Sequence, residues 1–306
     1  GQQGIGITGV VMYSQLTTGS KTKVTSKIEK DDYASVTEIA LDTRRNKAIP
    51  TTHERAELLN YEGEMVKHGL KIETTMKAKY QRGKQSVFQY LRMTSIVNPH
   101  ATIRLIVRDD EGTIDEGHWI RTTEKLPKTV EEIKPHPLSV TLAQLQRMLK
   151  ETDEKRLSKF LKNEFSPMTH RAIKEITKIS GVEVDRVPSR IKTDDAASIL
   201  AAFSEVRYTT PKNFEVCLSP IEDMLIKKGL SKAIDSRFAS TVSRKPILIQ
   251  GVPYQVEVGL VFGGDLPSDG PIEVLRFANR VPLMYQQGGC LLTKGLESVD
   301  WKKYGL

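Results

Sequence analysis

The stretch Gly1-Gln2-Gln3-Gly4-Ile5-Gly6 places three glycines within six residues at the start of the chain. Glycine adopts left-handed backbone angles without a steric penalty and lets a backbone approach a ligand closely. The following residues predict a helix whose apolar stripe is formed by Val10, Met12, Tyr13 and Leu16. A glycine turn before a helix presents backbone N–H groups and the positive end of the helix dipole, which suits phosphate. The pattern also fits a plain turn, so this stretch alone leaves both interpretations open.

The composition indicates a globular protein with a basic surface. The 306 residues suffice for about two domains, and no apolar run approaches the roughly 18 residues of a membrane helix. The net charge of +8 favours a polyanionic partner such as nucleic acid. Cys217 and Cys290 lie far apart, which fits a reducing compartment, excludes a cysteine metal site and predicts core residues rather than nucleophiles. No signal peptide is visible, and the opening glycine stands inside a motif, which indicates an internal fragment.

The first block predicts an α+β arrangement, an antiparallel sheet with helices on one face. Alternating apolar residues predict strands at 21–29, 36–42, 68–74 and 101–108, with turns at 43–46 and 109–112 and a loop or edge element at 50–68. A helix is predicted at 84–97, and its inner face is expected to hold Val87, Tyr90, Leu91 and Ser95. Three prolines between Leu126 and Pro137 mark a boundary.

Residues 138–206 predict a helical module. Its second helix carries the apolar stripe Leu157, Phe160, Leu161 and Phe165, and the third is expected to start at Ser166-Pro167, to bury Ile173, Ile176 and Ile179, and to end at Gly181. Thr193 is expected to cap the last helix. The outward positions are basic, comprising Arg147, Lys150, Lys155, Arg156, Lys159, Lys162, Arg171, Lys174 and Lys178. Such a face is either merely solvated or contacts a nucleic-acid backbone.

The last third predicts a further α/β unit. We expect a helix from Ile221 that Gly229 stops, strands at 247–250 and 254–262 around a turn at 251–253, a long strand at 273–284 and a helix at 291–299. The whole chain lacks an HExxH motif and paired cysteines or histidines at metal spacing. His136 between two prolines predicts a turn residue, Asp109-Asp110-Glu111 a hairpin tip, and Ser219 lies outside any nucleophile elbow. We therefore predict no complete catalytic set and no metal site.

Taken together, these stretches resemble the B subunits of archaeal-type DNA topoisomerase VI, a type IIB topoisomerase in the GHKL ATPase family. Residues 1–6 with 11–19 resemble the glycine-rich ATP lid, and Gln85-Ser86-Val87 with residues 96–101 resemble the later part of the same domain. Lys134-Pro135-His136-Pro137 and residues 148–152 resemble the entry to the helix–two-turns–helix module. Leu218-Ser219-Pro220-Ile221 with residues 276–283 and 300–305 resemble the transducer domain.

The resemblance implies three domains: the C-terminal part of a GHKL (Bergerat) ATPase sandwich at 1–130, a helix–two-turns–helix domain at 131–210, and an incomplete α/β transducer at 211–306. It implies that two B subunits dimerise on ATP and clamp duplex DNA, and that the transducer signals A subunits to cut and pass DNA within an A2B2 heterotetramer. The expected ATP-binding residues are Gly1, Gln2, Gln3, Gly4, Ile5, Gly6, Ile7 and Thr8. The DNA-binding candidates are Lys155, Arg156, Lys159, Lys162 and Arg171. The expected location is the cytoplasm or nucleoid of an archaeal or bacterial cell, without a membrane partner.

The chain departs from the family pattern in several ways. The family's Mg²⁺-binding asparagine, its general-base glutamate and its adenine-reading aspartate precede the glycine-rich stretch, so the Mg²⁺ ligand is expected outside this fragment. The transducer lysine is expected beyond Gly305. Leu70 stands where the family usually has threonine and cannot supply a hydroxyl. The fragment alone is therefore expected not to hydrolyse ATP.

Two alternatives stay open. The first is a topoisomerase-VI-B-like scaffold that binds DNA or a partner without ATPase activity, which Leu70 supports. The second is a DNA-repair protein that shares the helix–two-turns–helix module, which leaves both flanking regions unexplained.

Overall fold

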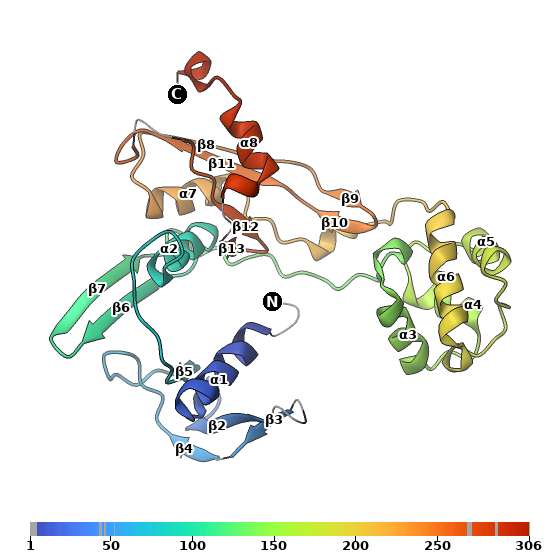
Figure 1. Cartoon of the computed structure of the whole chain (residues 1–306), viewed down its shortest axis with the longest axis horizontal. Coiled ribbons are helices and arrows are strands. Elements are labelled where there is room, and N and C mark those ends of the chain that lie inside the picture. Colours follow the sequence, from blue (N-terminus) through green and yellow to red (C-terminus); the bar gives the residue numbers. More distant parts are fainter. Residues whose placement is uncertain are drawn as a thin grey trace. The chain divides into compact units, whose positions relative to one another are not determined.

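A computed structural model describes residues 5–42, 45, 47–51, 53–267, 271–284 and 287–305. The chain forms two compact units, residues 1–81 and residues 82–306 (Figure 1). Helices and mainly antiparallel strands occur in both units, so the predicted mixed α and β character is confirmed. Helix α2 and the β6–β7 hairpin belong to the second compact unit, whereas the predicted first domain extends to residue 130. The three-domain division itself stays a prediction.

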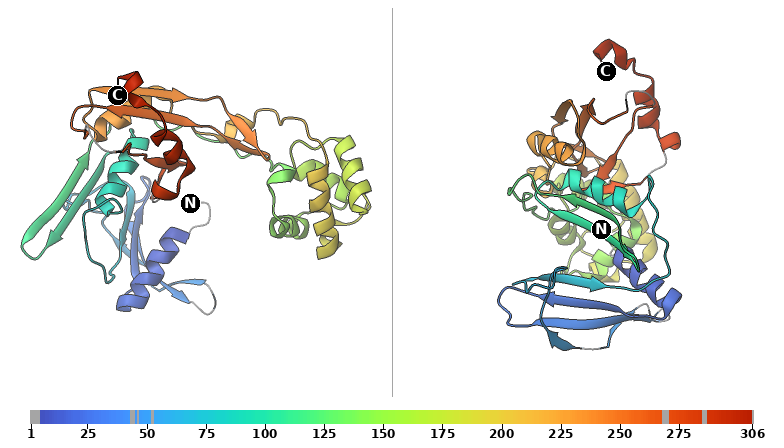
Figure 2. Two further views of the ribbon diagram at one scale, coloured as in Figure 1. Left: turned by 45° about the horizontal axis from the view of Figure 1, so that its top comes forward. Right: turned by 90° about the vertical axis from the view of Figure 1, so that its left-hand side faces the viewer.

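The N-terminal unit is a five-stranded antiparallel sheet with one helix. The sheet has the order β3-β2-β1-β5, and β4 pairs with another part of β2. Its elements are α1 (Ile5–Thr18), β1 (Thr22–Lys27), β2 (Ala34–Asp42), β3 (Lys47–Pro50), β4 (Glu54–Ala56) and β5 (Gly69–Glu73). Helix α1 packs on β2 and lies on one face of the sheet (Figure 2). The antiparallel pairing of the predicted strands at 21–29, 36–42 and 68–74 is confirmed by β1, β2 and β5. The predicted strand at 101–108 does not join this sheet, because it pairs with the strand at 112–119 instead. Positions 43, 44 and 46 of the predicted turn lie outside the described residues.

The apolar stripe predicted for α1 is wrong. Met12, Tyr13 and Leu16 are exposed, while Val11 and Ser14 are buried. Polar contacts decide which face of α1 is buried, because side-chain hydrogen bonds to backbone groups hold the helix. The Gln15 side-chain amide donates to the Leu41 carbonyl at 3.0 Å and accepts from the Leu41 N–H at 2.8 Å. An apolar periodicity cannot register contacts of this kind.

The helical module has its own core within the C-terminal unit. It comprises α3 (Leu142–Glu151), α4 (Leu157–Glu164), α5 (His170–Ser180) and α6 (Thr193–Glu205), with the 3-10 turns η1 (Pro137–Ser139) and η2 (Pro188–Arg190). The predicted stripe of α4 is confirmed, since all four of its apolar residues are buried. Phe165 meets Phe160 and Phe203 edge-on at the centre. Gly181 ends α5 at φ 70°, as predicted.

Three details of this module differ from the sequence prediction. Helix α5 is capped by Thr169, whose hydroxyl accepts from the Ala172 N–H at 3.2 Å, rather than by Ser166. Ile179 is exposed instead of buried. Thr193 is the first residue of α6 and not its cap. The predicted helix starts therefore shift by a few residues, because several threonines and serines compete for the capping role.

The remainder of the C-terminal unit alternates helices with two-stranded antiparallel pairs, β6–β7, β8–β11, β9–β10 and β12–β13. The strands are β6 (Ile103–Asp109), β7 (Gly112–Trp119), β8 (Phe238–Ser243), β9 (Ile247–Ile249), β10 (Val252–Tyr254), β11 (Glu257–Phe262), β12 (Arg276–Ala278) and β13 (Val281–Leu283). The helices are α2 (Val87–Val97), α7 (Asp223–Ala233), α8 (Leu291–Glu297), η3 (Phe214–Cys217), η4 (Gln287–Gly289) and η5 (Trp301–Tyr304).

Helices α2 and α7 approach each other at Gly229. A Cβ atom at Gly229 would lie 1.9 Å from the Ile96 carbonyl oxygen, so only glycine fits this crossing. The prediction that Gly229 stops α7 is wrong, because the helix continues to Ala233. The inner face of α2 is formed by Met93, Ser95, Ile96 and Val97. Of the predicted inner residues Ser95 is confirmed, whereas Val87 and Tyr90 are exposed.

The long strand predicted at 273–284 is in fact a hairpin. Asn279 and Arg280 have φ angles of 49° and 62°, the left-handed pair that a two-residue type I′ turn requires between β12 and β13. A second hairpin turns at Gln250 and Gly251, one residue before the predicted turn. The strand predicted at 254–262 is therefore divided between β10 and β11, and no apolar pattern indicated β8.

We predict that Gly229→Ala destabilises the C-terminal unit. The added methyl group would force α2 and α7 apart, and overpacking of this kind costs about 1–3 kcal/mol. Urea denaturation followed by tryptophan fluorescence measures this, because Trp119 and Trp301 both belong to this unit. The matched control is Gly295→Ala in α8, where the new Cβ meets nothing within 4 Å. Equal stability of the two variants would contradict the close approach.

Candidate functional site

The glycine-rich opening is described only from Ile5 onward. Gly1, Gln2, Gln3 and Gly4 lie outside the described residues, and Ile5, Gly6, Ile7 and Thr8 form the first turn of α1. The N–H groups that open a helix have no partner within it, whereas Thr8, at the end of this turn, already makes an interaction of its own. Gly6 is exposed, and a Cβ there would meet no atom within 4 Å. Packing against the described residues therefore does not require glycine at this position, which leaves close approach of a ligand as a reason for it.

The position of α1 on its sheet is fixed by hydroxyl groups. Ser14 Oγ donates to the Thr75 carbonyl at 2.7 Å, and Thr18 Oγ1 donates to the same carbonyl at 3.0 Å. Tyr13 adds a bond from its hydroxyl to the Lys77 carbonyl at 3.2 Å. These contacts tie the helix to the segment that follows β5, so the first turn of α1 is presented from an anchored element.

Leu70 lies on β5 opposite Ser26 of β1 and is 63% exposed. Its side chain offers no hydrogen-bonding group to a ligand. Whether this position contacts an adenine ring stays a prediction.

The predicted basic face of the helical module is exposed along its whole set of nine residues. Three of its arginines are paired with carboxylates, Arg147 with Glu151 at 3.0 Å, Arg156 with Asp185 at 3.6 Å and Arg171 with Glu175 at 3.7 Å. Part of the positive charge on this face is therefore already neutralised.

Lys155, Lys159 and Lys162 differ from those arginines. Within the described ranges, none of the three has a carboxylate oxygen within 4.0 Å. Lys159 and Lys162 stand three residues apart on α4 and so share a helical face. Of the five nucleic-acid candidates, these three lysines are the ones whose charge is available to a phosphate.

The start of α4 contributes through side chains rather than through its backbone. The Leu157 N–H donates to the Arg186 carbonyl at 2.8 Å, and the Ser158 N–H donates to the Val184 carbonyl at 2.9 Å. These amides would otherwise be free to bind an anion at a helix start. The charge of α4 is therefore presented by its lysine ammonium groups.

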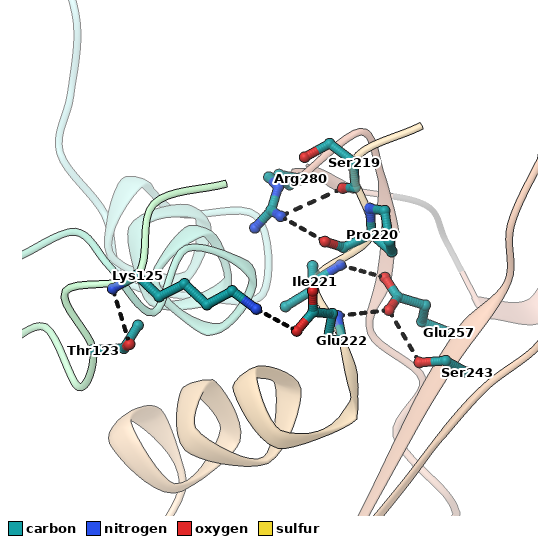
Figure 3. Close-up of polar contacts among 9 residues, drawn as sticks. All are labelled: Thr123, Lys125, Ser219, Pro220, Ile221, Glu222, Ser243, Glu257 and Arg280. Carbon is teal, nitrogen blue, oxygen red and sulfur yellow. Dashed lines mark hydrogen bonds and ion pairs between the residues drawn. The ribbon is translucent and has the colours of Figure 1, made fainter. Parts of the chain in front are cut away.

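Arg280 holds the C-terminal unit together from the β12–β13 turn. Its guanidinium donates to the carbonyls of Val97 at 3.1 Å and of Pro220 at 3.0 Å, with a longer bond to Ser219 at 3.4 Å. Figure 3 shows the contacts with Ser219 and Pro220. Burial lowers the pKa of Arg280, opposed by the nearby charges of Glu257 and Glu222. One side chain thus joins the end of α2, the segment before α7 and a hairpin.

Glu257 on β11 completes this polar cluster. Its carboxylate accepts from the backbone N–H groups of Ile221 and Glu222, both at 2.8 Å, and from Ser243 Oγ at 3.1 Å. Glu222 has an unusual φ of 77° and pairs through its own carboxylate with Lys125 Nζ at 2.6 Å (Figure 3). No sequence signal indicated Glu257, although the stretches around Ser219 and Arg280 carry the resemblance to a transducer.

The structure also revises the roles of three isolated side chains. His136 is buried, its Nδ1 accepts from the Leu138 N–H at 3.1 Å, and burial lowers its pKa. It caps the 3-10 turn η1, which confirms the predicted turn residue, and its burial is the additional finding. Cys217 and Cys290 are only partly buried and are not core residues. Backbone hydrogen bonds, chiefly from Thr293, lower the pKa of Cys290 to about 7, whereas burial raises the pKa of Cys217.

The remaining predictions concern the hairpin tip at residues 109–111, metal ligands and membrane-spanning helices. The Asp109 carboxylate accepts from the N–H groups of Glu111 and Gly112, which confirms the hairpin tip. Among the described residues, no three His, Cys, Asp or Glu side chains gather as metal ligands would. In the same part of the chain, no helix combines the length and apolar character that crossing a membrane requires.

Comparisons with known proteins give matches along the whole chain. Residues 214–306 match the family model described as "Topoisomerase VI B subunit, transducer". The type 2 DNA topoisomerase 6 B subunits of Methanococcoides burtonii and Archaeoglobus fulgidus are each 41% identical over 307 residues, covering all of this chain and 47% and 49% of their own lengths. The corresponding protein of Thermococcus gammatolerans is 32% identical over 350 residues, covering 99% of this chain and 60% of its own. The chain thus spans about half the length of the curated relatives it matches.

We predict that Arg280→Lys destabilises the C-terminal unit. Lysine keeps the charge but cannot reach three carbonyls with one planar group. These carbonyls are partly buried, and leaving such acceptors unsatisfied costs up to about 1–3 kcal/mol. Urea denaturation should show a lower midpoint with an unchanged slope. The control is Arg108→Lys at an exposed position of β6, which should change stability little; matching losses in both variants would remove the special role of Arg280.

Proposed function

Because this chain belongs to the family of DNA topoisomerase VI B subunits, we propose that it is part of the ATP-binding subunit of a type IIB DNA topoisomerase. Two copies dimerise on ATP and close a clamp on duplex DNA. The clamp signals A subunits in an A2B2 assembly to cleave one duplex and pass another, relaxing supercoils and separating linked DNA. The observation that carries this proposal is identity of about 40% along the whole chain, including the transducer region. The place of such work is the cytoplasm or nucleoid.

The nucleotide half of the proposal rests on the N-terminal unit. Residues Gly1 to Thr8 would hold the ATP phosphates through backbone N–H groups, and the open space at Gly6 supports this fit. ATP, with Mg²⁺, supplies the binding energy and the scissile phosphate. An antiparallel sheet with α1 on one face is the arrangement expected for part of a GHKL sandwich. The Mg²⁺ ligand is expected in a segment that longer relatives carry.

The DNA half of the proposal rests on the helical module. Lys155, just before α4, and Lys159 and Lys162 on α4 present positive charge that no carboxylate neutralises in the described structure, and α4 itself is packed into the core of the module. Lysines contact phosphates regardless of base sequence, and this suits a clamp that acts on any duplex. The chain's charge of +8 supports a polyanionic partner in the same way.

The second candidate is a scaffold that binds DNA or a partner without ATPase activity. Leu70 favours it, because a leucine cannot replace the hydroxyl expected there. The two candidates differ in whether nucleotide changes the assembly state. Sedimentation of a protein extended to the length of its relatives, with and without a non-hydrolysable ATP analogue, separates them. Dimers only with nucleotide support the clamp, and an unchanged monomer supports the scaffold.

We predict that Gly6→Ala weakens ATP binding by about tenfold, a change of about 1.4 kcal/mol. The methyl group would occupy the space where backbone and phosphates meet, although alanine itself favours a helix over glycine by about 0.5–1 kcal/mol. Calorimetry on the extended protein measures the affinity. Gly9→Ala is the matched control, since it adds the same methyl group to α1 further along the helix without a clash. An unchanged affinity of the Gly6→Ala variant for ATP would show that Gly6 is not one of the ATP-binding residues.

We predict that replacing Lys159 and Lys162 with glutamine weakens duplex binding and flattens its salt dependence. Each lost phosphate contact lowers the slope of log K against log salt by about 0.9. Fluorescence anisotropy with a labelled duplex at several salt concentrations gives that slope. The charge-matched control replaces Lys227 and Lys228, two exposed lysines on α7. Identical slopes for both pairs would exclude α4 as the contacting face.

A further inference from the structure

His136 stands where the chain enters the helical module. It precedes η1 and is 7% exposed, and its imidazole lies edge-on to the Tyr208 ring at 5.0 Å between centroids. Tyr208 follows α6, where the chain leaves the module. The Tyr208 hydroxyl is buried with no hydrogen-bond partner in the described structure. The entering and leaving segments therefore meet at one aromatic contact.

The tip of the β9–β10 hairpin rests on this imidazole. Gly251 has φ 78°, and a Cβ built on it would lie 2.3 Å from both Cγ and Nδ1 of His136. With Gln250 at φ 48°, the tip is a tight two-residue turn of defined shape. Glycine at 251 thus satisfies two demands, a left-handed backbone and direct contact between backbone and ring.

Backbone hydrogen bonds surround this contact. The Glu131 N–H donates to the Val216 carbonyl at 3.1 Å, and the Ser166 N–H donates to the Pro135 carbonyl at 3.1 Å. A cavity of about 210 Å³ lies beside them, lined by His136, Ser166, Leu248 and Gly251 among others. Residues 120–136 contain no helix or strand, so these contacts, and not a continuous element, hold the module at its entry.

We propose that His136 and Gly251 form a seat that positions the helical module on the β9–β10 hairpin. Both are positioning residues, and neither contacts a ligand. The purpose of the seat rests on the proposed function, in which it sets the direction from which the lysine face of α4 meets DNA. Because the hairpin lies between β8 and β11, which pack on α7, the seat also connects the module to the α2–α7 pair.

Hydrogen exchange in Gly251→Ala tests the seat. The methyl group would collide with the imidazole, so the Glu131 and Ser166 amides should exchange about tenfold faster. Gly181→Ala is the matched control, because it imposes the same left-handed strain at φ 70° while its Cβ meets nothing within 4 Å. Equal exchange at these two amides in both variants would overturn the seat.

A double-mutant cycle separates the collision from backbone strain. If the ring causes the effect, Gly251→Ala should change exchange little in a His136→Ala background. An effect of the same size in both backgrounds would show that strain alone acts and would overturn the proposal. The same proteins are then tested for duplex binding. Faster exchange at the Glu131 and Ser166 amides, together with weaker duplex binding and an unchanged salt slope, supports a positioning role. Faster exchange with unchanged duplex affinity overturns that role. The lysine variants test the DNA contact itself, independently of the exchange result.

Discussion

The C-terminal unit depends on one guanidinium group that meets three backbone carbonyls. Arg280 contacts Val97, Ser219 and Pro220, which belong to segments far apart along the chain. These carbonyls lie where helices and turns end, and a buried carbonyl without a donor is costly. Two-stranded pairs are weakly stable by themselves. A shared donor, together with the Glu257 carboxylate and the apolar cluster of Ile96, Ile226 and Leu230, joins these small pieces.

The sequence predicted elements best where an apolar pattern alone decides the structure. The stripe of α4 and the Gly181 end of α5 follow from local periodicity and from the left-handed preference of glycine. Prediction failed where a residue far away in the sequence determines the local structure. Gly229 looks like a helix end, but glycine is required there by the Ile96 carbonyl on another helix. Asn279-Arg280 looks like the middle of a strand, because arginine rarely occupies a left-handed turn and does so here while its side chain is held.

Some residues of the candidate sites could likewise be predicted from the sequence and others could not. The lysines of α4 could be found from the sequence, since an exposed helix face follows from the stripe opposite it. The sequence could not show which of these charges are neutralised. Arg156, for example, pairs with Asp185, which lies in the segment after α5. His136 carried no signal of burial between its two prolines, and Glu257 carried none of its role. Both are defined by backbone groups that approach from other parts of the chain.

The crossing at Gly229 has a mechanical consequence. Most helix pairs touch through layers of side chains, and such layers can slide or change rotamer when one helix moves. At Gly229 the backbone of α7 lies directly against the Ile96 carbonyl oxygen, so no side chain separates the two helices at this point, while Ile96 packs beside it on Ile226 and Leu230. Helices α2 and α7 should therefore move together as a rigid pair. A displacement at the end of α2 should be transmitted through α7 to the β8–β11 strand pair, which packs on α7.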